Sequence, residues 1–256
     1  MDGNQWKSAI EKLVTDYVER YREENELPML WRTPLVGYAD AKDPCIQDLP
    51  KIVTEVHKLP QDFMENPSVV ISYFIPFTKE LAKTNVGVEG NAASEEWARA
   101  YGITNTMMAR LNEYLAEEIR KLGGRAAVPE GVGMLEDIVK SNWSQRHLAY
   151  AAGLGTFGIN NMLITEKGCC GRYNSIVADI PVEPGHRKEQ ENCMYKSRGL
   201  CKKCVKNCFS GALTVDGFDR HKCYETCKKN EAVFGVDVCG KCDTDIPCAF
   251  TAPKLV

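Results

Sequence analysis

Apolar side chains recur every three or four positions in two stretches of the chain, with charged residues between them. This spacing places the apolar side chains on one face of a helix. We therefore predict amphipathic helices over residues 6–24 and 105–122, the second ended by the pair Gly123-Gly124. Packing of each apolar face on a core is a sufficient role for both helices.

Uninterrupted apolar runs, rather than periodic ones, predict the strands. Residues 68–77, SVVISYFIPF, are rich in β-branched and aromatic side chains and close on Pro76, which suits a buried strand. Further strands are predicted at residues 125–129 (RAAVP), 162–165 (MLIT) and 173–183 (YNSIVADIPVE). A strand, a long helix and a second strand in this order predict an α/β domain.

A glycine-rich loop, GLGTFGIN at residues 153–160, follows a short predicted helix around WSQRHLAYAAG. Its glycines at 153, 155 and 158 match the dinucleotide-binding pattern, but that mechanism needs a strand before the glycines and a helix after them. Here a helix precedes and a strand follows, so we reject a dinucleotide site. The glycines still allow close backbone approach, either to the sheet or to a flat cofactor, and the residues alone leave both interpretations open.

The segment EPGHRKEQEN, residues 183–192, is polar and contains proline and glycine. We place a domain boundary within it, near Gly185. The prediction is an α/β domain over residues 1–185 and a smaller domain over residues 186–256, which holds most of the cysteines.

The composition refines this picture by exclusion. The 256 residues are 44% hydrophobic and 26% charged with a net charge of −3, which gives no support for binding nucleic acid or an anionic membrane. The longest apolar run is shorter than the roughly 20 residues of a membrane helix, and the charged N-terminus does not resemble a signal peptide. We expect a cytoplasmic protein with no membrane partner.

The cysteines carry the clearest chemical signal. Twelve are too few for a disulfide scaffold of this length, and a reducing compartment favours metal ligation by clustered thiols. All but Cys45, Cys169 and Cys170 lie between Cys193 and Cys248. We expect those three to be small buried hydrophobic residues, with Cys169 and Cys170 as reserve ligands should Cys193 not be one.

The run CKKCVKNC, residues 201–208, resembles half of a bacterial ferredoxin. In two-cluster ferredoxins the last cysteine of a run binds the other cluster, so the nine cysteines separate into two interleaved sets with Cys227 spare. Each set would hold one 4Fe–4S cluster. The first set is Cys193, Cys201, Cys204 and Cys248, and the second set is Cys208, Cys223, Cys239 and Cys242.

Zinc is the rival interpretation of the same cysteines. The segments CKKC and CGKC are two C-x2-C pairs, which also suit a zinc ribbon. Zinc ribbons would leave Cys193, Cys208, Cys223 and Cys248 without a role. We therefore favour iron–sulfur clusters.

The stretch WSQRHLAYAAGLGTFGINNMLITEKGCCGRYNSIVADIP, residues 143–181, followed by the two cysteine runs, resembles the epoxyqueuosine reductase family and its relatives, the reductive dehalogenases. The resemblance covers roughly residues 65–250 and is carried by the helix with Arg146, the loop Ala152–Asn160 and the order of the cysteines.

The resemblance implies a nitroreductase-like α/β domain that binds cobalamin, followed by a small ferredoxin-like domain whose two 4Fe–4S clusters pass electrons singly to cobalt. The residues that would hold the corrin lie on the short helix and the glycine loop. They are Arg146, His147, Gly153, Leu154, Gly155, Thr156, Phe157, Gly158 and Asn160.

Departures from the family concern the proton donor and the length of the chain. Where the family has an Asp leading into a Glu-Arg pair, this chain has Val139 and Gln145-Arg146. Asp137, two residues earlier, and Tyr73, on an apolar strand, are the candidate catalytic residues. The chain ends eight residues after Cys248, without the helical repeats of the tRNA-reading enzymes, so we rank tRNA reduction below reduction of a small molecule.

The leading hypothesis is an iron–sulfur oxidoreductase with base-off cobalamin that reduces a small organic substrate. A low-potential donor of the ferredoxin or flavodoxin type would supply electrons, and the basic segment 196–207, KSRGLCKKCVKN, suits an acidic donor. Two other classes stay open, namely an electron-transfer or reductive-activation protein without cobalamin, and a zinc protein with an interaction role. We expect no nucleic-acid partner.

Overall fold

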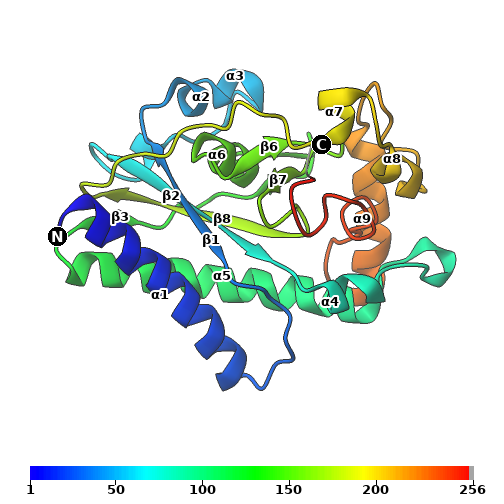
Figure 1. The fold of residues 1–256 in the computed structure, drawn as a ribbon, viewed down its shortest axis with the longest axis horizontal. Coiled ribbons are helices and arrows are strands. Elements are labelled where there is room, and N and C mark those ends of the chain that lie inside the picture. Colours follow the sequence, from blue (N-terminus) through cyan, green and yellow to red (C-terminus); the bar gives the residue numbers. More distant parts are fainter. Residues whose placement is uncertain (254–256) are drawn as a thin grey trace.

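The computed structural model describes residues 1–253 of the chain. A four-stranded sheet forms its centre, and each neighbouring pair of strands is antiparallel (Figure 1). Across the sheet the order is β1 (Leu35–Asp40), β2 (Val69–Pro76), β8 (Gly171–Asp179) and β3 (Arg125–Ala127).

β8 therefore lies between two strands that precede it by many residues. It pairs with β2 over its length, from Val69 opposite Ala178 to Pro76 opposite Gly171. β2 and β3 run in the same direction on either side of it, because both are antiparallel to β8. The predicted mixed α/β fold is confirmed, with an antiparallel sheet in place of neighbouring parallel strands.

Two long helices, α1 (Gly3–Glu24) and α5 (Glu95–Lys121), pack on one face of the sheet. The first matches its prediction and begins at a capping box, in which the Asp2 carboxylate accepts from the backbone N–H of Gln5 at 2.9 Å. The predicted start of the second helix at residue 105 was wrong by ten residues. Ser94 caps its actual start, and the buried Thr104 interrupts the apolar pattern there because it accepts a hydrogen bond from Trp31.

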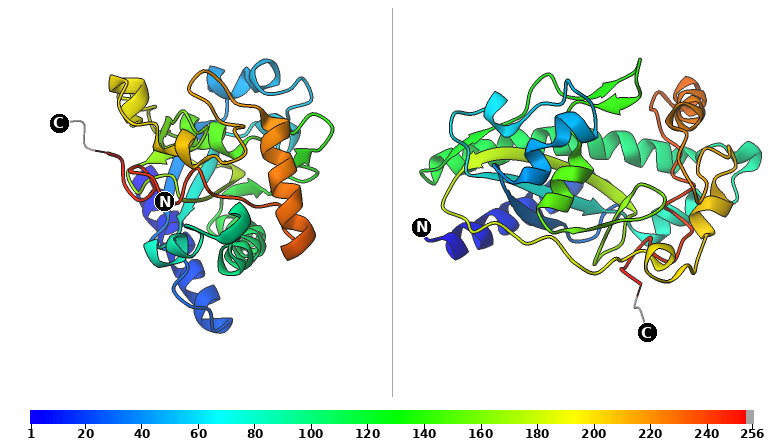
Figure 2. Two further views of the ribbon diagram at one scale, coloured as in Figure 1. Left: turned by 90° about the vertical axis from the view of Figure 1, so that its right-hand side faces the viewer. Right: turned by 90° about the horizontal axis from the view of Figure 1, so that it is seen from above.

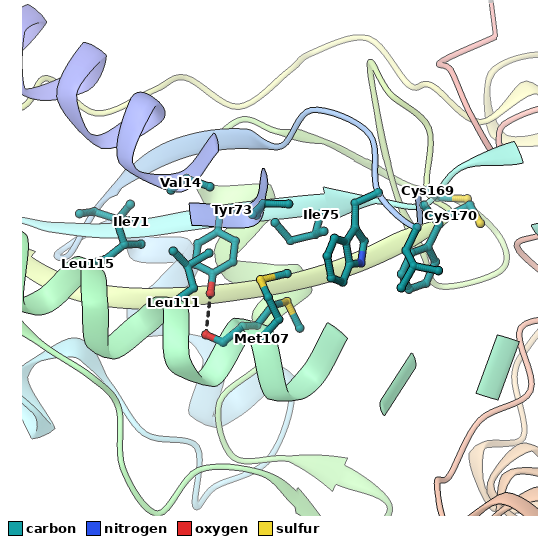
Figure 3. Packing of buried hydrophobic residues seen from close by; sticks show 14 of the residues in the cluster. Val14, Ile71, Tyr73, Ile75, Met107, Leu111, Leu115, Cys169 and Cys170 are labelled. Atoms are coloured by element: carbon teal, nitrogen blue, oxygen red, sulfur yellow. Dashed lines mark hydrogen bonds between the residues drawn. The ribbon is translucent and has the colours of Figure 1, made fainter. Parts of the chain in front are cut away.

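β2 is buried along both of its faces, as its composition predicted. Ile71, Tyr73 and Ile75 point toward α1 and α5 and meet Leu111 and Leu115 there (Figure 3). Full burial of a large aliphatic side chain stabilises a fold by roughly 1.5–3 kcal/mol, so this strand anchors the whole domain.

The other face of the sheet is covered by short elements. They are α2 (Pro44–Gln47), α3 (Leu49–Ile52), α6 (Gln145–Ala151) and the hairpin of β6 (Gly155–Phe157) and β7 (Leu163–Thr165). Part of the stretch predicted as a glycine loop is thus a strand. Its backbone pairs with β7 from Gly155 opposite Thr165 to Phe157 opposite Leu163, which the glycine spacing had concealed.

The remaining short elements lie in the connections. They are η1 (Pro60–Asp62), α4 (Lys79–Thr84), η2 (Glu89–Asn91) and the hairpin of β4 (Met134–Leu135) and β5 (Lys140–Ser141). Within residues 1–253, no helix is both long enough and apolar enough to cross a membrane.

The cysteine-rich segment lies at the end of the molecule opposite the N-terminus (Figures 1 and 2). It contains α7 (Met194–Arg198), α8 (Lys203–Asn207) and α9 (Arg220–Phe234). The backbone N–H of Cys169 donates to the carbonyl of Cys248 at 3.0 Å and that of Cys170 to the carbonyl of Ala249 at 2.9 Å, which ties the segment to the start of β8. The boundary near Gly185 stays a prediction, and residues 254–256 of the predicted second domain lie outside the described residues.

Candidate metal centre

The first predicted cysteine set lines a single cavity. Cys193, Cys201, Cys204 and Cys248 all border this space, whose empty volume is about 340 Å³ including the part open to solvent. Burial raises the pKa of the Cys204 thiol to about 11, and the neighbouring thiols of Cys248, Cys193 and Cys201 act in the same direction. Four thiols from separate parts of the segment therefore face one another.

The second predicted set also gathers in space. Cys223 comes from α9, Cys208 follows α8, and Cys239 and Cys242 lie in the loop after α9. Burial and then the adjacent Asp243 raise the pKa of the Cys242 thiol, and the thiols of Cys239, Cys223 and Cys208 raise it further. The interleaved assignment stays a prediction, because Cys227 also lies beside Cys223 and Cys239.

The donor type alone does not select one metal group. Within residues 1–253 no three His, Cys, Asp or Glu side chains converge closely enough to hold one metal ion. Thiolates are ligands of both zinc ions and iron–sulfur clusters, so the kind of metal group stays a prediction.

The cysteines outside the two sets lie beside predicted ligands. Cys227 is one helical turn after Cys223 on α9, and a hydrogen bond between the two side chains lowers the pKa of Cys223 to about 7. The buried Cys169 is hydrogen-bonded to Cys248 in the same way, which lowers the pKa of Cys248. Cys45 lies on α2, where burial and the carboxylate of Asp43 raise the pKa of its thiol.

Asn160 connects the two sets. Its side chain is 4% exposed and lines the cavity of the first set, while its Nδ2 donates to the backbone carbonyl of Cys242 at 3.0 Å. Its Oδ1 accepts from the backbone N–H of Met162 at 3.2 Å and fixes the amide orientation. Asn160, which was predicted to contact the corrin, therefore positions the loop that carries Cys242.

The glycines of the loop have protein neighbours. A Cβ atom on Gly153, which has a φ of +76°, would collide with the backbone of His186, and one on Gly155 would collide with the backbone of Ile164. At Gly158 the obstacle is the side chain of Asn160. Packing therefore requires these glycines, and their pattern is not independent evidence for a cofactor.

Three further loop and helix residues predicted to hold the corrin also have local partners. Leu154 packs against Gly37 of β1, and Thr156 accepts a hydrogen bond from the backbone N–H of Asn192 at 2.8 Å. The ring of Phe157 lies with its centroid 4.9 Å from that of His147.

His147 is held neutral near neutral pH. Its Nδ1 lies 2.8 Å from the hydroxyl of Ser144, and its ring packs beside Phe157. Burial, followed by the charges of Arg146 and His57, lowers the pKa of His147 to about 4. Through these contacts His147 packs α6 against β6.

Arg146, in contrast, has donors that face outward. One nitrogen, Nη1, donates to the backbone carbonyl of Asn161 at 2.7 Å, while much of the side chain is exposed. Partial burial and then the charge of Arg172 lower the pKa of Arg146, whereas Cys242, Tyr173 and Asp243 raise it. Arg146 thus lies beside the second cysteine set.

The edge of β8 near Arg146 is only partly paired with a strand. β3 pairs only with residues 177–179 of β8, which leaves residues 171–176 without a strand on that side. Gln145 of α6 approaches this edge, donating to Asn174 at 2.9 Å and accepting from the Ser175 hydroxyl at 2.7 Å. We call the group Arg146, Arg172, Asn174 and Asp243 the β8 edge site.

Three members of this site, Arg172, Asn174 and Asp243, escaped the sequence analysis. Asp243 is 5% exposed and its Oδ1 has no hydrogen-bond partner within residues 1–253. Burial raises its pKa to about 7 against the opposing charges of Arg172 and Arg146. Arg172 donates to Asn105 at 3.2 Å and lies over the ring of Tyr101. The sequence feature that points to Asp243 is its position directly after Cys242 in a cysteine run.

Asp137 lies exposed in the turn between β4 and β5. This turn reaches α9, where the Tyr224 hydroxyl donates to Glu136 at 2.8 Å and Arg220 donates to the carbonyl of Val139 at 3.3 Å. Val139 has a φ of +50°, which is strained for a β-branched residue. Asp137 is therefore on a hairpin fastened to the helix that carries Cys223.

Tyr73 is not placed for catalysis, and this part of the prediction was wrong. Its side chain is 0% exposed and lies between the sheet and α5 (Figure 3), while α6 and the glycine loop lie on the opposite face of the sheet. Its hydroxyl is hydrogen-bonded to the carbonyl of Met108 at 3.1 Å and to Oδ1 of Asn112 at 2.8 Å. The hydroxyl is a satisfied core group.

Comparison with known proteins defines the class of the fold. None of the protein-family models matches the chain, and no curated protein sequence matches it. Among solved structures, epoxyqueuosine reductase from Streptococcus thermophilus has a TM-score of 0.56 at 15% identity, covering 93% of this chain and 67% of that one. A selenomethionine-labelled epoxyqueuosine reductase has a TM-score of 0.53 at 16% identity, covering 96% of this chain and 70% of that one.

A third similar structure is an epoxyqueuosine reductase with an epoxyqueuosine-modified tRNA stem loop, with a TM-score of 0.54 at 16% identity over 94% of this chain and 66% of that one. The protein is thus a mixed α/β protein with a cysteine-rich C-terminal segment. Its fold is that of the epoxyqueuosine reductases, as the sequence motifs predicted. At these identities the similarity shows the fold alone.

Proposed function

We propose that this protein is an iron–sulfur oxidoreductase that holds two 4Fe–4S clusters and base-off cobalamin and reduces a small organic substrate. One observation supports the proposal: Cys193, Cys201, Cys204 and Cys248 line one cavity, and Cys208, Cys223 and Cys239 lie near enough to Cys242 to raise the pKa of its thiol. The shared fold with known reductases supports the oxidoreductase class.

The chain itself explains how electrons would pass from one set to the other. Cys204 of the first set and Cys208 of the second set are one turn apart around α8. Cys242 and Cys248 return to the two sets from a single loop, and Asn160 contacts both regions. Interleaved ligands hold the two sets side by side, which is the arrangement that short-range electron transfer needs.

The β8 edge site is where cobalamin would lie. Arg146 is exposed there and would donate to the amide carbonyls of a corrin, while the buried carboxylate of Asp243 opposes its positive charge. When bound, cobalamin would supply reductive chemistry at cobalt. Asp137, on the hairpin that contacts α9, is the proposed proton donor.

The test uses anaerobically purified protein. Clusters would give a broad absorption shoulder near about 400 nm and about eight iron atoms per chain. Cobalamin added under reducing conditions should then stay with the protein in equilibrium dialysis. If cobalamin dialyses away freely from protein that carries its clusters, the cobalamin part of the proposal fails.

A second candidate function is electron transfer or reductive activation of a partner without cobalamin. The packing of Gly153, Gly155 and Gly158 against protein atoms favours it, because the loop then needs no cofactor to explain it. Full cluster content together with no retained cobalamin or flavin is the result expected for this function.

Reduction of a modified tRNA is the third candidate, since one similar structure contains a tRNA stem loop. We rank it last because the net charge of this chain is −3. Binding of a modified stem loop at physiological salt would make tRNA reduction the favoured function.

A further inference from the structure

The segment from Cys193 to Cys208 presents a positively charged surface in an acidic protein. Its sixteen residues contain five basic and no acidic side chains, while the whole chain has a net charge of −3. All five are exposed, and they lie on or beside α7 and α8 at the end of the molecule (Figure 2). We call this the α7–α8 surface, made of Lys196, Arg198, Lys202, Lys203 and Lys206.

This surface adjoins the cavity of the first cysteine set. The Nζ of Lys202 lies 5.5 Å from the centroid of the Tyr195 ring, and Tyr195 lines that cavity. Leu200, between the two short helices, is 55% exposed and its backbone N–H donates to the carbonyl of Met194, another lining residue. The exposed side chain of Leu200 thus lies among the lysines, directly before Cys201 in the sequence.

Part of the positive charge is left over after local pairing. Glu191 lies 3.9 Å from Lys196, and Asp245 lies 3.0 Å from Lys203. Lys202 and Lys206 form no ion pair within residues 1–253. Lys202 is the N-cap residue of α8, and Lys206, one helical turn later, donates its backbone N–H to the carbonyl of Lys202 at 3.0 Å, so the two charges lie on the same side of the helix.

We propose that the α7–α8 surface docks an acidic one-electron carrier protein of the flavodoxin type beside the first cysteine set. This inference rests on the proposed function, because the carrier would supply the electrons for reduction. The carrier's flavin hydroquinone would give up one electron and become the semiquinone, and that electron would pass to the cluster that the first cysteine set would hold. The negative rim around a flavin would pair with the lysines, with Leu200 at the centre of the contact.

A binding measurement tests this without relying on turnover. The anaerobic protein with its metal centre is titrated with a purified acidic flavodoxin in its oxidised form, and the dissociation constant is measured by calorimetry at low and at physiological salt. The double variant Lys202→Glu/Lys206→Glu should bind about tenfold or more weakly at low salt, because attraction becomes repulsion at two positions. Added salt should weaken the wild-type complex and narrow this difference.

The matched control is Lys42→Glu, at an exposed lysine in the connection between β1 and α2. It makes the same charge change far along the chain from α7 and α8 and should leave binding unchanged. Iron content and circular dichroism of each variant confirm that the fold and the metal centre are kept.

Three results would overturn the docking surface: no binding by the wild type, equal binding by the double variant, or equal weakening by Lys42→Glu. Failure of the proposed function has a different signature, since protein without iron and sulfide fails before any flavodoxin is added. Reduction by a photochemically reduced deazaflavin gives the complementary readout. The double variant should accept electrons from this small reductant at the wild-type rate while accepting them more slowly from reduced flavodoxin.

Discussion

The two cysteine sets have the same ligand chemistry in different surroundings. The first set borders a cavity beside exposed lysines, and two of its cysteines, Cys193 and Cys204, are buried. The four cysteines of the second set are all partly buried and lie next to Arg146 and the buried Asp243, on the side of the β8 edge site. Identical donors thus have different neighbours, and under the proposed function electrons would enter at the first set and be used at the second.

The largest expected effect separates ligands from the spare thiol. Cys204→Ser in the first set and Cys239→Ser in the second should each remove about four of the eight iron atoms, because each cubane needs four thiolates. Cys227→Ser, the matched control on α9, should keep full iron content. Iron and sulfide analysis of the anaerobic proteins measures this, and undiminished iron in either ligand variant would refute the interleaved assignment.

A smaller effect is expected where the two sets meet. Asn160→Ala removes the donor to the carbonyl of Cys242 and leaves a buried acceptor unpaired, which costs about 1–3 kcal/mol. Iron should therefore be lost to a chelator faster from the second set than from the first, as followed by EPR. Asn192→Ala, which removes a 2.7 Å bond to the carbonyl of Ile164, is the control with a similar loss elsewhere. Equal loss in both variants would contradict a special role for Asn160.

The free energy of unfolding should depend on pH through His147 of α6. The pKa of His147 is lowered to about 4 in the folded protein, so between about pH 6.5 and 4 the unfolded chain binds a proton that the folded chain does not. Stability should fall as the pH is lowered through this window. In His147→Gln the fall, measured by urea unfolding, should be shallower, and an unchanged slope would show that His147 is not held neutral.

The smallest effect is expected at Tyr73, on the opposite face of the sheet from both α6 and the glycine loop. Tyr73→Phe leaves Oδ1 of Asn112 without this donor and should destabilise the protein by about 1 kcal/mol. Reductase turnover with a small substrate should stay at the wild-type level. A large loss of turnover at unchanged stability would restore Tyr73 as a proton donor.

The two cysteine sets follow from the sequence because the ferredoxin spacing is local and the exchange of the last cysteine is a known rule, and their role as ligands stays a prediction. The long amphipathic helices and the buried strand β2 were predictable for the same reason, since periodicity is a local property. Cys193 joins its set in the structure although seven residues separate it from Cys201.

Other features depend on contacts between distant parts of the chain. The insertion of β8 between β2 and β3 has no local signal, because strand order is decided by pairing over about a hundred residues. β6 was concealed by the glycine spacing, and Gly155 is required there because a Cβ atom would collide with the backbone of Ile164. Arg172 and Asp243 were missed because single charged residues acquire meaning only when the fold brings them beside Arg146.

The most direct test of the account is spin quantification by EPR on the fully reduced, anaerobically purified protein. Two interleaved 4Fe–4S clusters predict a signal that integrates to about two spins per chain, with broadening from the interaction of neighbouring clusters. A protein that contains zinc and gives no iron signal, or one that integrates to a single spin with about four iron atoms, would contradict the two-cluster assignment.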